Sequence, residues 1–244
     1  MGEDPAVDDW MADNLPKDAA VGVDPWCVSV DTAQKWEHAF SKKQQKLVQT
    51  CTNLVDEVWK NRPPAQNNPV NVHPLEFAGR TVADKLKNLR QKLREEEAWA
   101  IIIKTLDELH AFAIVTSFSA FFYVDKRKLS SEVNSHLEQN GIEVRDYSAV
   151  SSDVVLLASN QLTSTTSANQ TLADGPKDME TGSGTNGSDE KTHNLIWIDP
   201  GSCCFAFCSK LNSDQVVLKQ SPVPLAKVIK VGHKIACSQT ITSL

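Results

Sequence analysis

The chain has 244 residues, with 25 Lys and Arg against 31 Asp and Glu, so its formal net charge is −6. With 41% hydrophobic and 23% charged residues, its composition is that of an ordinary globular protein that can bury a core. Most of the negative charge lies in residues 1–20 and 162–192. The rest of the chain is nearly neutral, which argues against an extended phosphate-binding surface and therefore against a nucleic-acid partner.

The sequence shows no signal for a membrane or for secretion. Its wholly apolar runs are no longer than stretches such as 98–103, far below the roughly 20 residues of a membrane helix. The first twenty residues are acidic and contain no apolar core of a signal peptide. Six cysteines without such a signal favour free thiols in a reducing compartment. We therefore expect a cytoplasmic protein without membrane contact.

The first 62 residues predict a strand, a helix and a second strand. We expect these elements at 21–23, 32–45 and 46–51. Asp24-Pro25 is expected to turn the chain after the first strand, and Asp31 is the expected N-cap of the helix. The Asn- and Pro-containing stretch 61–74 then breaks the pattern, which places a first boundary there.

A long amphipathic helix is predicted from Thr81, because Thr81 and Asp84 resemble a capping box. The apolar residues that follow recur at helical spacing: Val82, Leu86, Leu89 and Leu93. The β-branched run 99–104 is typical of a central strand.

The remaining elements alternate between strands and short helices. Two strands at 111–116 and 120–124 are expected to join at 117–119. Ser130 can cap a helix that Gly141 would end. Further elements are expected as a strand at 142–145, a helix at 151–159, a strand at 195–198, a helix at 202–210 and a strand at 215–219. The Ser-, Thr- and Gly-rich stretch 161–193 is expected to be a disordered surface loop.

A short internal similarity links the two halves. Gly22 to Pro25 and Trp197 to Pro200 are both the end of a strand followed by Asp-Pro, then a helix and another strand. Two related α/β domains would explain this similarity, and chance would also explain so short a match.

Three features resemble sites of chemistry. Gly182 to Gly187 match G-x-G-x-x-G, but this fingerprint needs a strand before it and a helix after it, so we interpret the match as linker sequence. Cys203, Cys204 and Cys208 cluster, but a structural zinc needs four ligands, so packing in a core is the favoured interpretation. His110 adjoins an apolar strand and is interpreted as a structural residue.

The basic clusters are small. Lys126 to Lys128 and the lysines at 42, 43 and 46 have no interleaved aromatic residues, so we interpret them as solvated. Neither a G-x-S-x-G motif nor a P-loop occurs. The residues alone supply no nucleophile with its base, no metal shell and no phosphate cradle. We therefore assign no catalytic, cofactor-binding or metal-ligating residue.

Several segments, taken in order, resemble one known family. They are Val21–Pro25, Asn53–Trp59 with Asn61–Pro63 after it, Gly79–Leu93, Thr105–Glu108 and Ser221–Lys227. This series is similar to the non-catalytic N-terminal part of the cytosolic three-domain Xaa-Pro aminopeptidases (aminopeptidase P). The resemblance covers most of residues 1–227.

The resemblance implies an α/β fold of the creatinase N-terminal (ribonuclease H-like) type, with a mixed sheet and helices on both faces. It implies four segments: the C-terminal part of a first domain at 1–62, a linker at 63–79, a second domain at 80–227 with the insertion 161–193, and a divergent tail at 228–244. In this family a further catalytic domain binds two divalent metals, usually manganese. That domain removes the first residue from peptides with proline in second position.

The chain departs from the family pattern, so three hypotheses stay open. The metal-binding domain is absent, which predicts a truncated non-catalytic region with no cofactor in this chain. A second hypothesis is a stand-alone binding or dimerisation module that associates with full-length aminopeptidase P or with its own copy. A third is an incomplete gene model of an active enzyme, because a family segment is missing between Leu109 and His110.

Overall fold

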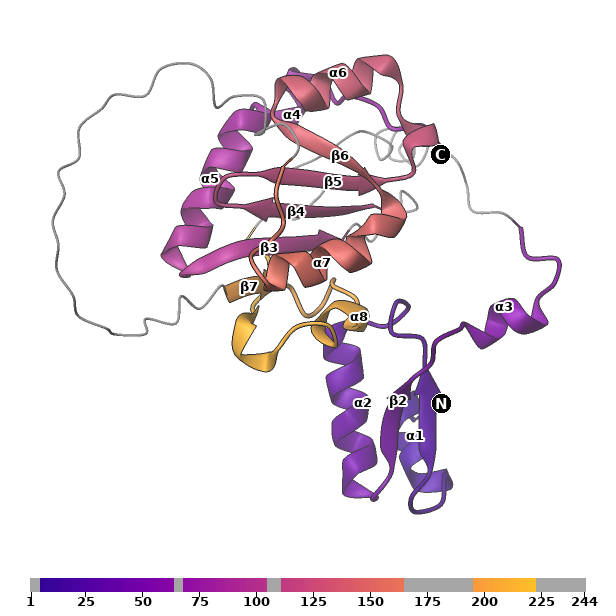
Figure 1. Ribbon diagram of the computed structural model, residues 1–244. Helices are drawn as coiled ribbons and strands as arrows, with labels where there is room; N and C mark the ends of the chain where they lie inside the picture. The colour runs from indigo at the N-terminus through magenta and orange to yellow at the C-terminus, as the bar shows by residue number, and fades with distance from the viewer. Residues whose placement is uncertain (1–4, 64–67, 105–110, 165–194, 223–244) are drawn as a thin grey trace, which may run out of the picture.

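The computed structural model describes residues 5–63, 68–104, 111–164 and 195–222. In these ranges the strands form a two-stranded sheet, β1–β2, and a six-stranded sheet in the order β6–β5–β4–β3–β7–β8. The strands are β1 (Ala20–Val23), β2 (Lys46–Gln49), β3 (Ala98–Lys104), β4 (Phe112–Thr116), β5 (Ala120–Val124), β6 (Ile142–Asp146), β7 (Leu195–Ile198) and β8 (Val216–Leu218). Figure 1 shows the larger sheet above the smaller one.

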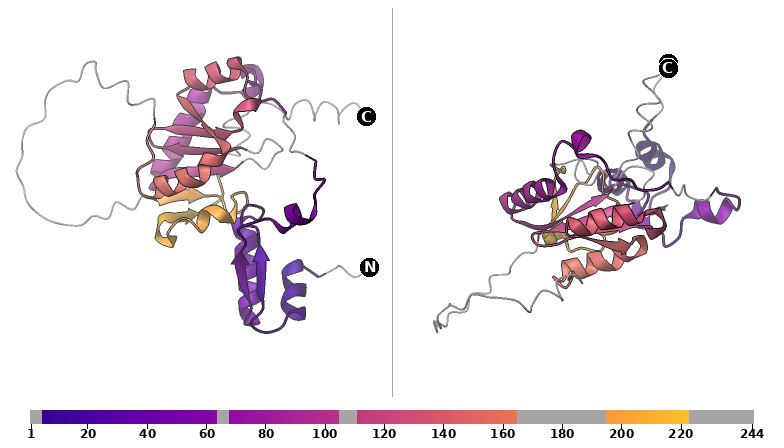
Figure 2. Two further views of the ribbon diagram at one scale, coloured as in Figure 1. Left: turned by 45° about the vertical axis from the view of Figure 1, so that its right-hand side comes forward. Right: turned by 90° about the horizontal axis from the view of Figure 1, so that it is seen from above.

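Helices accompany both sheets, as the two further views in Figure 2 also show. They are α1 (Val7–Asn14), α2 (Val30–Lys42), α3 (Leu54–Val58), α4 (Leu75–Ala78), α5 (Val82–Glu95), α6 (Ser131–Gln139), α7 (Val150–Ala158) and α8 (Phe205–Cys208), with 3-10 turns η1 (Lys126–Lys128), η2 (Tyr147–Ala149) and η4 (Ser213–Gln215). Among the described residues, no helix has both the length and the apolarity that crossing a membrane requires.

The larger sheet is mixed, as predicted. The β3–β4 and β4–β5 pairs are antiparallel, whereas β5–β6, β3–β7 and β7–β8 are parallel. Every residue of β4 and β5 is buried, which is expected where helices cover both faces of a sheet. The Thr116 side-chain oxygen accepts the Ser119 N–H at 2.8 Å and so closes the predicted turn between these strands.

The core of the larger sheet consists of two layers. On one face, α5 and α6 contribute Leu86, Leu89, Leu93, Val133 and Leu137, which pack with Ile101, Ile103, Val115 and Phe122. On the other face, α7 and α8 contribute Val150, Val154, Leu157, Ala206 and Phe207, which pack with Ile102, Phe112, Ile114 and Tyr123. The predicted sheet with helices on both faces is therefore confirmed.

Two helix predictions rested on local capping signals, and both are confirmed. Thr81 accepts the Asp84 N–H at 3.1 Å at the start of α5. Ser130 accepts the Val133 N–H at 3.2 Å at the start of α6. Gly141, at φ 66°, adopts the left-handed conformation that follows the end of α6.

The smaller sheet is covered on one face only. Ala12 of α1 and Phe40 of α2 pack against Val21 of β1, and the Phe40 side chain is fully buried. Ala20 and Gly22, which alternate with the buried valines of β1, are exposed. Helix α1 was not predicted, because half of its residues are Asp or Asn and its stability comes from contact with α2.

Helix α2 differs from its prediction at both ends. Ser29, rather than Asp31, is the N-cap, and its side-chain oxygen accepts the Thr32 N–H at 3.2 Å. The helix ends at Lys42 because Gln44 takes a positive φ of 58°, which turns the chain into β2. The predicted helix at 202–210 likewise contracts to α8.

Several predictions fall largely or wholly outside the described residues. They concern the insertion 161–193, the motif at Gly182 to Gly187, the Leu109–His110 junction and the tail 228–244. The division into domains stays a prediction. Within the predicted linker 63–79, Val70 is buried in the core with α5, and its N–H donates to the Lys128 carbonyl at 2.8 Å.

Candidate interaction site at the paired Asp-Pro turns

The two Asp-Pro segments form turns of the same geometry. The Asp24 carboxylate accepts the Trp26 N–H at 2.9 Å, and the Asp199 carboxylate accepts the Gly201 N–H at 3.1 Å. In each case the second carboxylate oxygen reaches the segment that follows the next strand. Asp24 accepts from the Asn53 amide at 2.8 Å, and Asp199 accepts from the Ser221 N–H at 3.1 Å.

These turns also bind one another through a set of reciprocal backbone hydrogen bonds. Ser29 and Cys204 form an antiparallel bridge. On either side of it the bonds come in matched pairs. They are Val30 N–H to Cys203 C=O (3.1 Å) with Phe205 N–H to Val28 C=O (2.9 Å), and Asp31 N–H to Pro200 C=O (3.0 Å) with Ala206 N–H to Pro25 C=O (2.9 Å).

The pairing has the pattern of a local two-fold axis. In these paired bonds, a single constant shift in residue number relates each donor and acceptor of the first turn to the equivalent residue of the second. The next strands repeat the pattern, because Thr50 N–H donates to Val23 C=O at 2.8 Å and Lys219 N–H donates to Ile198 C=O at 3.1 Å. The short sequence similarity therefore corresponds to two strand–turn–helix–strand units with equivalent geometry.

Aromatic side chains fill the junction of the two units. The Phe207 ring lies 5.4 Å from Trp26 and 5.1 Å from Phe112 between centroids, both edge to face. Tyr147 lies 5.3 Å from Phe112. The Lys104 ammonium donates to the Trp26 carbonyl at 3.3 Å and thus ties β3 to the first turn. The junction is a packed interface rather than an open cleft.

The cysteines of the second turn pack as the sequence predicted. Cys203 and Cys204 are fully buried in the core with Phe207, and Cys208 is half-buried beside them. Burial raises the pKa of the Cys208 thiol to about 11. A hydrogen bond to Cys204, with burial, raises the pKa of Cys203. Cys203 and Cys208 are therefore expected to be unreactive, structural thiols.

Alkylation rates test whether these cysteines are buried and unreactive. At pH 8 a maleimide is expected to label the exposed Cys51 at least about tenfold faster than Cys203 or Cys208, since thiolate and access control the rate. Peptide mapping by mass spectrometry at successive times measures each site. Labelling in urea is the control, in which the rates converge. Equal rates in the folded chain would contradict the buried assignment.

A buried polar network, which the sequence did not reveal, joins β5, β6 and α7. The Asp153 carboxylate accepts from the Tyr123 hydroxyl at 2.8 Å and from the Arg145 guanidinium at 2.7 Å. Arg145 also donates to Glu143 at 2.9 Å and lies 4.4 Å above the Phe121 ring centroid. Its donors are thus held by protein groups, which is the arrangement of a structural network.

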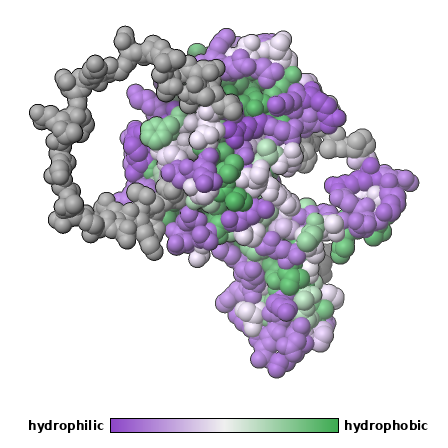
Figure 3. All heavy atoms as spheres, viewed as in Figure 1, coloured by the Kyte–Doolittle hydropathy of each residue, from purple (hydrophilic) through white to green (hydrophobic). Residues whose placement is uncertain are grey.

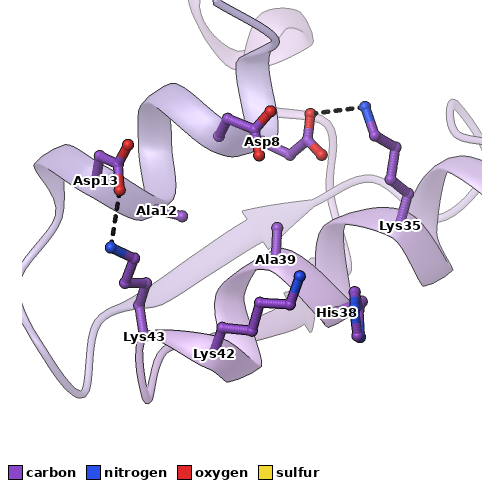
Figure 4. A pocket seen from close by; sticks show the side chains of 9 residues that line it. Asp8, Ala12, Asp13, Lys35, His38, Ala39, Lys42 and Lys43 are labelled. Carbon is purple, nitrogen blue, oxygen red and sulfur yellow. Dashed lines mark hydrogen bonds and ion pairs between the residues drawn. The ribbon is translucent and has the colours of Figure 1, made fainter.

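A shallow hollow lies between α1 and α2 (Figure 4). Its charged groups are largely paired, since Lys35 contacts Asp8 at 3.1 Å and Lys43 contacts Asp13 at 2.9 Å. Lys42 and His38 also line it. These ion pairs hold the two helices together and do not converge on a reacting centre.

The other residues considered in the sequence lie apart from one another. Lys126 to Lys128 form a 3-10 turn in which Asp125 pairs with Arg127. His38 is exposed and His136 is half-buried, whereas His110 lies outside the described residues. Within the described ranges, no three His, Cys, Asp or Glu side chains converge as metal ligands would.

The chain belongs to the family of creatinase/prolidase N-terminal domains, whose model matches residues 61–110 and 109–232. Among its relatives, aminopeptidase P1 of Lotus japonicus is 58% identical over 255 residues, which cover 94% of this chain and 39% of the relative. Aminopeptidase P1 of Arabidopsis thaliana is 49% identical over 247 residues and is covered to 37%. The resemblance to the N-terminal region of aminopeptidase P is thereby confirmed.

A solved structure has the same fold. It is the X-prolyl aminopeptidase of Caenorhabditis elegans, described as a cytosolic enzyme with a di-nuclear active site. The TM-score is 0.70 at 19% identity, over 91% of this chain and 34% of that one. The chain therefore spans less than two fifths of the curated relatives and about a third of this structural neighbour.

Proposed function

We propose that these residues form the non-catalytic N-terminal region of an Xaa-Pro aminopeptidase. One observation carries the proposal: the family matched is an N-terminal domain, and the matched relatives extend far beyond it. The polar groups at the paired turns and around Asp153 bind one another, as in a scaffold. Such an enzyme removes the first residue from peptides with proline in second position and uses two manganese ions. We assign this reaction and its metal ions to the remaining part of the enzyme.

Metal retention tests this proposal. Native mass spectrometry of the chain, purified with excess manganese and then desalted, is expected to show the metal-free mass. A matched preparation of a full-length relative provides the positive control. Retention of two ions per chain would overturn the proposal, because the dinuclear centre would then lie within this sequence.

We expect the protein in the cytoplasm, as for the structural neighbour.

A second candidate function is association with full-length aminopeptidase P or with a second copy. Helix α3 supports it, because Leu54, Val58 and Trp59 are 66%, 83% and 51% exposed. In Figure 3 α3 stands apart from the other described elements, with hydrophobic atoms on its lower side. Co-purification with tagged full-length enzyme is the expected result. Elution as a free monomer in its presence would contradict association.

The third possibility is that the sequence is an incomplete gene model of an active enzyme, and two features of the comparisons support it. The alignment with the Lotus relative spans 255 residues, more than the 244 of this chain, so the relative contains residues without a counterpart here. The family model also matches in two separate stretches, 61–110 and 109–232, so the match is interrupted at Leu109–His110. If the gene model is incomplete, sequencing the transcript across Leu109–His110 and beyond Lys227 is expected to show a longer reading frame. An unbroken transcript of the present sequence would exclude this explanation.

A further inference from the structure

The link between α6 and β6 contains an Asn-Gly pair. Asn140 follows the last residue of α6, and Gly141 precedes Ile142, the first residue of β6. The sequence contains one other such pair, at 186–187, which lies outside the described residues. An Asn-Gly pair is chemically labile, because glycine has no side chain that hinders attack by its backbone nitrogen on the preceding side-chain amide. The link is therefore a candidate site for modification without an enzyme.

The reaction at such a pair has two steps and consumes one water. First, the Gly141 backbone nitrogen attacks Cγ of Asn140. A C–N bond forms, the bond between Cγ and Nδ2 breaks, and ammonia leaves with the backbone proton, which yields a five-membered succinimide. Water then opens either carbonyl of this ring. One opening gives aspartate with the original main chain, and the other gives isoaspartate, whose main chain is one carbon longer.

The folded backbone holds the reacting atoms of this pair apart. Asn140 has φ −97° and ψ 9°. At this ψ the Gly141 nitrogen is nearly eclipsed with the Asn140 nitrogen and lies away from Cβ of Asn140. Closure of the succinimide ring requires the Gly141 nitrogen beside Cβ. A rotation about the Cα–C bond of Asn140 must therefore precede the reaction.

Three hydrogen bonds resist this rotation. They run from Asn140 Nδ2 to His136 C=O (2.7 Å), from Asn140 N–H to Leu137 C=O (3.1 Å) and from Gly141 N–H to Glu138 C=O (2.9 Å). The first engages the amide nitrogen that leaves, and the third engages the nitrogen that attacks. The reaction therefore requires the last turn of α6 to open.

The products do not restore these contacts. A carboxylate at position 140 cannot donate to the His136 carbonyl. Its negative charge also lies at the C-terminal end of α6, where the helix dipole is negative. Leu137 and Ile142, on either side of the link, are both buried in the core of the larger sheet. A main chain that is one carbon longer between them displaces one buried side chain relative to the other.

We propose that Asn140 is a site of spontaneous deamidation and isoaspartate formation, and that opening of the last turn of α6 controls its rate. The modification loosens the contact of α6 with β6, the edge strand of the larger sheet (Figure 1). This inference goes beyond the proposed function and is independent of it, because the reaction needs only these residues and water.

Timed incubation of the full chain at neutral pH tests the site. Peptide mapping by mass spectrometry detects the gain of about one mass unit at Asn140, and electron-transfer fragmentation distinguishes aspartate from isoaspartate. In the urea-unfolded chain both products are expected to accumulate. In the folded chain their formation is expected to be at least about tenfold slower, because the open last turn is a minor state.

Two variants at Glu138 change the opening of this turn and leave the reacting residues unaltered. The Glu138 side chain is exposed, and both variants keep its backbone carbonyl. Because glycine favours the helix much less than alanine, deamidation should be about fivefold faster in Glu138→Gly than in Glu138→Ala. Hydrogen exchange of the Gly141 amide should rise by the same factor, since both rates depend on the same opening.

Asn140→Gln is the chemical control. It keeps a side-chain amide, but its extra methylene disfavours closure onto the Gly141 nitrogen. No product is therefore expected at this position over the same time. Product formation at the rate of the parent chain would contradict the succinimide route.

Three further results would overturn the proposal. They are equal rates in the folded and urea-unfolded chains, a product that is aspartate alone, and a Glu138→Gly variant whose Gly141 amide exchanges faster while Asn140 reacts no faster. None of these outcomes bears on metal retention, so the proposed function is tested separately.

Discussion

Replacing Asp153 with alanine is expected to lower the free energy of unfolding by about 3 kcal/mol. The Asp153 and Arg145 side chains are 9% and 17% exposed, so removing one partner leaves a charge in a poorly solvated site. Arg145 keeps its contact with Glu143, which places the loss at the lower end of the usual range. Urea unfolding monitored by circular dichroism measures it.

Matched variants separate charge from hydrogen bonding in this network. Asp153→Asn keeps an acceptor for Tyr123 and should cost less than alanine. Tyr123→Phe removes one hydrogen bond and should cost about 1 kcal/mol. A loss below about 0.5 kcal/mol for the alanine variant would show that the network does not contribute to stability.

The network also predicts how stability changes at alkaline pH. Burial, then the hydrogen bond to Asp153, raises the pKa of Tyr123 above its ordinary value. The folded chain therefore holds the phenolic proton more tightly than the unfolded chain. This contribution is complete below about pH 10 and is lost as the pH rises further. Unfolding at pH 8 to 11 should show a steeper decline for the parent than for Tyr123→Phe.

Replacing Phe207 with alanine is expected to cost about 3–5 kcal/mol, because a fully buried aromatic side chain is lost. Phe207 contacts both Trp26 of the first turn and Phe112 of β4. The loss should therefore also loosen the contact between the two units. Urea unfolding measures the loss of stability. Faster hydrogen exchange at the Val30 and Phe205 amides would report the loosened contact between the units.

Phe118 provides the control for the aromatic junction. Its side chain is 81% exposed, so Phe118→Ala should change stability by less than about 0.5 kcal/mol. If Phe207→Ala lowered stability without changing exchange at Val30, the two units would be held together by their backbone bonds alone.

Local signals explain which parts of the fold could be predicted from the sequence. Thr81, Ser130 and Gly141 act on their own helix ends, so their roles are visible without the fold. Asp31 was the wrong N-cap because Ser29 has the same capping chemistry two residues earlier. The β-bridge between Ser29 and Cys204 fixes the backbone at Ser29, and this tertiary contact determines which residue caps the helix.

The candidate sites depend on tertiary contacts, and the sequence shows these only in part. The similarity of the two Asp-Pro segments was visible, but not that they bind one another. The network at Asp153 needs β5, β6 and α7 to meet, and Arg145 and Asp153 carry no motif. Helix α1 is short, so its stability comes from its contact with α2 rather than from a pattern that could be recognised.

Peptide turnover tests the central claim most directly. The purified chain, incubated with a peptide that has proline in second position and with excess manganese, is expected to release no amino acid above the buffer blank. A full-length aminopeptidase P in the same assay is the positive control. Release that is proportional to the concentration of this chain, that co-elutes with it and that a chelator abolishes would contradict the assignment of a non-catalytic region.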